Sequence, residues 1–197
     1  MIKLINKLSY YPLLVIIILI GACNTNNTPL PRGYLRIDLP EHNYKLSDTS
    51  YPYIIEYSKY ATLQSLQNDL KQEYWINIVY PQFKAKVYLS YKSVNGNLIT
   101  YLEDAYKLVS KHIPKADAII DSVVANNKQN VYGLTYKIRG SGAASPYQFF
   151  VTDSTSHFLR GALYFDIVPN NDSLEPVIDF ITADMEHLIN TLKWNNK

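Results

Sequence analysis

The stretch SLEPVIDFITADMEHLINTL, residues 173–192, has the most regular pattern in the chain. Its apolar residues recur every three or four positions, which predicts a helix with one apolar stripe that lies across a sheet. Asp172 or Ser173 is expected to cap its N-terminus. The acidic residues Asp179, Asp184 and Glu186 are expected off the stripe. The stripe itself consists of Leu174, Val177, Ile178, Ile181, Met185, Leu188, Ile189 and Leu192.

Short segments rich in β-branched and aromatic residues precede this helix, and they predict strands. Because the later ones follow one another with short polar links, the sheet is expected to be largely antiparallel. The predicted strands are Tyr53–Tyr57, Trp75–Tyr80, Lys84–Tyr91, Ala118–Val124, Val131–Ile138, Tyr147–Thr152 and Phe158–Ile167.

A second helix is predicted over Leu98–Lys111, with Asn97 as a possible cap and Pro114 as its stop. Its apolar face is expected to comprise Leu98, Leu102, Ala105, Tyr106 and Val109. The fold class is therefore predicted as α+β, a largely antiparallel β-sheet packed by two amphipathic helices. The order of elements is similar to the PsbP/Mog1-type layout, a likeness that does not fix function.

The N-terminal stretch LLVIIILIGACNTNN, residues 13–27, indicates export. Its apolar run of residues 13–20 is too short to span a bilayer. It follows Lys3 and Lys7 and ends in small residues, as a secretory signal peptide does. Ile20–Cys23 resembles a bacterial lipobox, which predicts lipidation at Cys23. We expect residues 1–22 to be a lipoprotein signal peptide, 23–31 a lipidated, disordered tether, and 32–197 a single α+β domain.

The charge and the cysteine content of the chain bear on its partners, its disulfides and its location. Of 19 basic residues, two lie in the signal peptide, which leaves 17 against 17 acidic ones. A neutral chain without a basic stripe argues against nucleic acid as a partner. Cys23 is the sole cysteine, so no internal disulfide is expected. The residue after Cys23 is Asn24, and not the acidic residue that signals retention in the inner membrane. We therefore expect the lipoprotein at the outer membrane, facing the periplasm.

Three motifs suggest chemistry, and each also has a structural interpretation. Asp153–His157 contains the residue types of a hydrolase triad, but five consecutive residues do not readily converge, and Asp and Ser also organise turns. Gly140–Ser145 lacks the Lys-Ser/Thr ending of a phosphate-binding loop. Trp75 and Trp194 suit either a core or a sugar site.

The histidines offer no spacing typical of a metal site. His112 ends the first helix, where it can interact with the helix dipole, and His187 lies late in the second. We expect structural roles for both. No metal, cofactor or catalytic residue is assigned from the sequence.

Several segments resemble the gliding-motility lipoprotein GldD family of Bacteroidota. They follow the same order along nearly all of the chain after Cys23. These segments are Pro31–Pro40, Tyr80–Ala85, Leu102–Ala105, Lys115–Ile119, Val131–Leu134, Gln148–Thr155, Phe158–Phe165 and Lys193–Trp194.

The resemblance implies a non-enzymatic cell-envelope lipoprotein needed for gliding, associated with type IX secretion and with other envelope or gliding lipoproteins. Members often carry cysteines at the positions of Tyr51 and Tyr74, so this chain must join those two segments by packing. A periplasmic ligand- or glycan-binding lipoprotein stays open as an alternative. So does an envelope hydrolase that would use Asp153, Ser154 and His157.

The segment Arg32–Pro40 follows the tether and has two interpretations. It can form an edge strand that closes the sheet. Alternatively, Tyr34 and Arg36 remain exposed and contact another envelope lipoprotein, since Tyr and Arg are frequent interface anchors.

Overall fold

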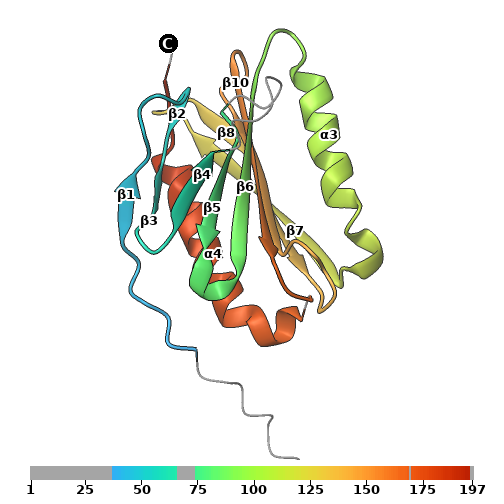
Figure 1. The fold of residues 1–197 in the computed structure, drawn as a ribbon. Coiled ribbons are helices and arrows are strands. Elements are labelled where there is room, and N and C mark those ends of the chain that lie inside the picture. Colours follow the sequence, from blue (N-terminus) through green and yellow to red (C-terminus); the bar gives the residue numbers. More distant parts are fainter. Residues whose placement is uncertain (1–36, 66–73, 169, 196–197) are drawn as a thin grey trace, which may run out of the picture. The chain divides into compact units, whose positions relative to one another are not determined.

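An antiparallel sheet of seven strands forms the centre of the computed structural model, which describes residues 37–65, 74–168 and 170–195. The strands follow the order β4-β5-β6-β10-β9-β8-β7 (Figure 1). They are β4 (Thr62–Ser65), β5 (Ile76–Tyr80), β6 (Ala85–Ser93), β7 (Ala118–Asn126), β8 (Val131–Arg139), β9 (Tyr147–Thr152) and β10 (His157–Phe165). All neighbours pair antiparallel. The predicted α+β class and antiparallel sheet are confirmed.

The helix α4 (Asn171–Thr191) packs on one face of this sheet. Ile181 and Met185 share its core with strand residues such as Leu89 and Leu159. The apolar stripe is as predicted, but the predicted cap was wrong. Asn170, rather than Asp172 or Ser173, is the N-cap residue. Asp184, expected off the stripe, is buried, and its carboxylate is hydrogen-bonded inside the protein.

The helix α3 (Leu98–Ser110) packs on the opposite face (Figure 1). Ala105 and Val109 are buried there together with Tyr136 and Phe158. Tyr106, expected in the apolar face, is instead 64% exposed. The helix ends before the 3-10 turn η2 (Ile113–Lys115), which contains the predicted stop Pro114.

Two small sheets replace the single strand predicted over Tyr53–Tyr57. The strand β2 (Tyr53–Ile54) pairs with β11 (Lys193–Trp194), and β3 (Glu56–Ser58) pairs with β1 (Tyr44–Leu46). The chain changes partner at Ile55, whose N–H donates to Ser47 Oγ at 3.1 Å. Another 3-10 turn, η1 (Pro81–Phe83), joins β5 to β6.

Candidate functional site

The strand β7 forms one edge of the large sheet, and among the described residues it pairs with β8 alone. An edge strand presents unpaired backbone N–H and C=O groups, which can pair with another extended chain. β7 is nine residues long, longer than most protected edge strands. Val123 near its middle is 78% exposed. Because Val123 pairs opposite Leu134, a residue of the core beneath α3, it lies on the α3 side of the sheet.

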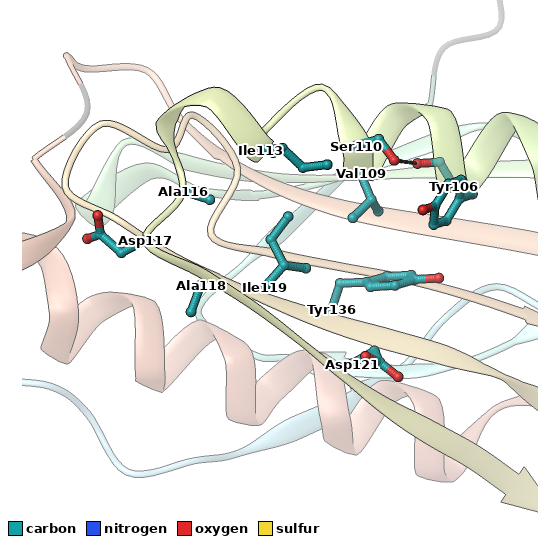
Figure 2. A pocket seen from close by; sticks show the side chains of 10 residues that line it. All are labelled: Tyr106, Val109, Ser110, Ile113, Ala116, Asp117, Ala118, Ile119, Asp121 and Tyr136. Carbon is teal, nitrogen blue, oxygen red and sulfur yellow. Dashed lines mark hydrogen bonds between the residues drawn. The ribbon is translucent and has the colours of Figure 1, made fainter.

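A cavity of about 400 Å³ lies beside this edge, between α3, the connection that follows it, and strands β7 and β8. Figure 2 shows Val109 from the helix and Ile119 and Tyr136 from the strands directed into the space between these elements. These three side chains give the cavity a largely apolar floor. Its size is in the range of known ligand and peptide anchor sites.

Exposed apolar side chains extend this cavity at the surface. Tyr106 and Ile113, which line it, are 64% and 59% exposed. Ser110 Oγ donates a hydrogen bond to the Tyr106 carbonyl at 2.9 Å (Figure 2). We call the surface formed by the cavity, the β7 edge and these exposed side chains the α3–β7 groove.

The charged groups that line the α3–β7 groove are acidic. Asp117 and Asp121 belong to the cavity lining, and neither forms an ion pair with another described residue. Burial raises the pKa of Tyr136, and the charges of Asp121 and Tyr106 raise it further. Tyr136 therefore stays a neutral hydroxyl, and the groove combines an apolar floor with negative charge.

The sequence analysis missed this groove, although one signal was present. Ile99, Tyr106 and Ile113 recur every seven positions and are all more than half exposed. A seven-residue apolar repeat outside the main helix stripe is typical of a second contact surface. The local sequence of β7 could not show that this strand lies at the edge of the sheet, since that position depends on the order of all the strands.

The predicted site residues Cys23, Tyr34 and Arg36 all lie outside the described part of the chain. The structure does describe Ile37–Pro40, the end of the segment expected to form an edge strand. These four residues form no strand, so the edge-strand interpretation is wrong for them. Leu39 packs against the core instead, and Pro40 has no N–H to give to a ladder.

The Asp153–His157 motif forms a turn, which is the structural alternative given for it in the sequence analysis. Asp153 Oδ1 accepts hydrogen bonds from the N–H groups of Thr155, Ser156 and His157 at 3.0, 2.8 and 2.8 Å. Ser154 has a positive φ of 69° and donates its N–H to Thr152 Oγ1. The His157 ring is hydrogen-bonded to the Tyr91 hydroxyl at 2.8 Å. The aspartate therefore holds the β9–β10 turn.

The Gly140–Ser145 connection is fixed to the start of α4. The side-chain amide of Asn171 donates to the carbonyls of Gly140 and Ala143 at 2.8 and 2.9 Å. Gly140 has a φ of +134°, and a Cβ there would lie 2.6 Å from the Lys115 carbonyl oxygen. Glycine is therefore required here by backbone packing.

The histidines and tryptophans have structural contacts. Burial and then the charge of Arg160 lower the pKa of His112, which disfavours the cation that would interact with the helix dipole. His187 Nε2 pairs with Glu56 Oε2 at 2.7 Å. Trp75 Nε1 donates to a β6 carbonyl, and the Trp194 ring stacks on His157.

The described residues contain no group of three or more His, Cys, Asp or Glu side chains placed to hold a metal ion. None of their helices combines the length and hydropathy that a bilayer crossing requires.

Comparison with known proteins gives one family. The sequence model described as gliding motility lipoprotein GldD matches residues 24–194. No match was found among curated proteins. Among solved structures, the chain is similar to the solution structure of cyanobacterial PsbP (CyanoP) from Synechocystis sp. PCC 6803. The identity is 7% and the TM-score 0.48, over 81% of this chain and 97% of that one.

Proposed function

The chain belongs to the family of gliding motility lipoprotein GldD, and we propose that it serves this machinery as a non-enzymatic protein-binding component associated with type IX secretion. The single observation that carries the binding role is the α3–β7 groove. A nine-residue edge strand, which among the described residues pairs with β8 alone, lies there beside a 400 Å³ apolar cavity. Exposed apolar surface of this kind marks interaction sites in proteins that remain soluble.

The lipid anchor forms part of the same proposal. Cys23 would carry the acyl chains and residues 24–31 would form the tether. The support is the Ile20–Cys23 lipobox behind a basic and apolar leader. Asn24, which is not acidic, supports the outer membrane, facing the periplasm, as the location. An anchored domain on a short tether binds its neighbours at high effective concentration.

The proposed occupant of the α3–β7 groove is an extended, basic segment of another envelope protein. It would add a strand to β7, since main-chain hydrogen bonds to a free sheet edge give affinity in β-augmentation. One of its apolar side chains would enter the cavity between Val109, Ile119 and Tyr136. Its Lys or Arg side chains would pair with Asp117 and Asp121, which have no ion-pair partner among the described residues.

The test replaces the exposed Val123 by arginine in a host whose gliding depends on this protein. Val123→Arg puts a cation and a long side chain at the centre of the edge. Leu46→Arg is the matched control, because Leu46 is 67% exposed on β1, outside the groove. We expect Val123→Arg to abolish gliding and type IX secretion at normal protein level, while Leu46→Arg leaves both intact.

Two results would oppose the proposal. Normal gliding of the Val123→Arg strain would show that gliding does not need the groove. Equal loss of gliding in the two arginine variants would show that the effect of Val123→Arg is not specific to the groove. A melting temperature measured on each purified lipoprotein separates loss of binding from loss of fold. Tyr106→Glu, on the helix side of the groove, gives a second variant that does not alter the sheet.

A further inference from the structure

A second cavity, of about 240 Å³, lies on the other flank of α3. It is enclosed by that helix and by strands β5, β6 and β10, and it shares no lining residue with the α3–β7 groove. Its volume is below the range for drug-sized ligands. It therefore suits a ligand of about monosaccharide size.

Four aromatic side chains line this second cavity, Trp75, Tyr88, Tyr101 and Phe158, and each is held in place by its own contacts. Trp75 Nε1 donates to the Tyr91 carbonyl at 2.8 Å. The Tyr101 hydroxyl accepts a hydrogen bond from Asn97 at 2.9 Å. Tyr88 meets Tyr164 edge to face. Fixed aromatic rings with polar edges can contact the C–H face of a sugar while hydrogen bonds form at its rim.

A buried polar atom in the same cavity lacks a partner. Asn77 lines the cavity and is only 7% exposed, yet its Oδ1 accepts no hydrogen bond within the described structure. Buried side-chain oxygens are nearly always hydrogen-bonded in folded proteins. The observation points to a donor supplied by a ligand, such as a hydroxyl group.

Cations outnumber anions around the second cavity. The Arg160 guanidinium donates to Gln148 Oε1 at 2.6 Å and is also hydrogen-bonded to the Tyr164 side chain, which fixes its plane and leaves others of its five N–H donors for a ligand. Lys92 Nζ lies 4.5 Å from the centre of the Tyr101 ring. The one acidic lining residue, Asp104, is half exposed and lies 4.0 Å from Lys107 Nζ. The cavity therefore favours an anionic group.

We propose that this second cavity binds a small sugar acid, a monosaccharide that carries a carboxylate. Its ring lies against Trp75 and Tyr88, one hydroxyl donates to Asn77 Oδ1, and the carboxylate pairs with Arg160 and Lys92. Neither a neutral sugar nor a simple carboxylate satisfies all of these groups. The proposal does not depend on the α3–β7 groove, since the two sites share no residue.

The test uses the fluorescence of Trp75 in the full-length lipoprotein in detergent. Trp75 and Trp194 are the only tryptophans, so Trp194→Phe leaves Trp75 as the sole reporter and keeps a ring against His157. The ligands titrated are D-glucuronate, D-glucose and acetate. We expect a saturable change with glucuronate, with glucose and acetate weaker by about tenfold or more.

Variants then assign the carboxylate contact. Arg160→Gln should weaken glucuronate binding by about tenfold or more, while Arg139→Gln, an exposed arginine outside the cavity lining, should leave it unchanged. If Arg160→Gln does not fold, Lys92→Gln tests the carboxylate contact in its place and should likewise weaken glucuronate binding. The proposal is overturned by no response to glucuronate, by equal binding of glucose, or by glucuronate binding that survives in the folded cavity variants.

Discussion

His42 Nδ1 lies 2.7 Å from Oδ1 of Asp184, across 142 positions of the sequence. The same carboxylate accepts a hydrogen bond from the Tyr80 hydroxyl at 3.0 Å, and the His42 ring stacks on Phe180 at a centroid distance of 4.5 Å. Asp184 is 2% exposed. These contacts fix the segment that precedes β1 onto the middle of α4.

The first prediction concerns this buried carboxylate. Asp184→Ala leaves the buried Tyr80 hydroxyl without its acceptor, so we expect a loss of about 1–3 kcal/mol in the free energy of unfolding. Asp179→Ala is the control on the same helix. Its partly exposed pair with Lys137 should contribute only about 0–1 kcal/mol. Urea denaturation measures both, and equal losses would contradict the structural role of Asp184.

The second prediction concerns acid stability. Burial by itself would raise the pKa of Asp153, but hydrogen bonds from the backbone of His157, Ser156 and Thr155 and from the Thr155 hydroxyl lower it overall. A depressed folded pKa stabilises the protein above the unfolded value of about 3.9. This stabilisation is lost as the pH falls through the folded pKa.

Urea midpoints measured on the acid side for wild type and Asp153→Asn test this linkage. The asparagine variant should be less stable than wild type at neutral pH. The difference between the two should shrink as the solution is acidified through the pKa of Asp153. A constant difference at every pH would show that Asp153 does not titrate in this way.

The third prediction concerns Tyr51 and Tyr74, the aromatic pair that joins two segments of the chain. The rings of Tyr51 and Tyr74 meet edge to face at 6.4 Å, and the Tyr53 hydroxyl donates to the Tyr74 carbonyl. Packing thus joins the two segments, as expected from the sequence. A double-mutant cycle with Tyr51→Ala and Tyr74→Ala should give a coupling free energy of about 0.5–1.5 kcal/mol. Strict additivity would argue against the pair.

The fourth prediction concerns the anchor. Cys23→Ser removes the thiol that receives the lipid, so the precursor should remain unprocessed or be mislocalised. Metabolic labelling with a palmitate analogue, followed by membrane fractionation, measures this. The structure does not describe Cys23, so this experiment is the direct test. Label retained by the serine variant would exclude lipidation at this position.

Local pattern predicted the main elements well. The alternation predicted over Lys84–Tyr91 lies in β6 from Ala85 on, and the apolar stripe of residues 173–192 lies in α4 except for Leu192, because burial on one face leaves a clear period in both. The short strands β1 and β4 were missed. They have three and four residues, too few for a period to be visible.

The strand order and the burial of Asp184 could not be predicted from the sequence, because both depend on contacts between distant segments. The strand β10 enters the sheet between β6 and β9, which leaves β7 at the edge. This order depends on pairing between distant segments and not on any local motif. The burial of Asp184 likewise depends on His42 and Tyr80, which approach from elsewhere in the chain. Neither the position of the groove at the sheet edge nor the buried network could therefore be predicted before the fold was known.

The central claim, that the α3–β7 groove binds a basic extended segment of another envelope protein, is tested most directly by site-specific photocrosslinking in gliding cells. A benzoyl-phenylalanine replaces Val123 in one strain and Leu46 in another. The account predicts one discrete crosslinked envelope protein from position 123 only, mapped to a segment rich in Lys or Arg, and its loss when Asp121→Lys is added. The same crosslink from both positions, or no crosslink from position 123, would contradict it.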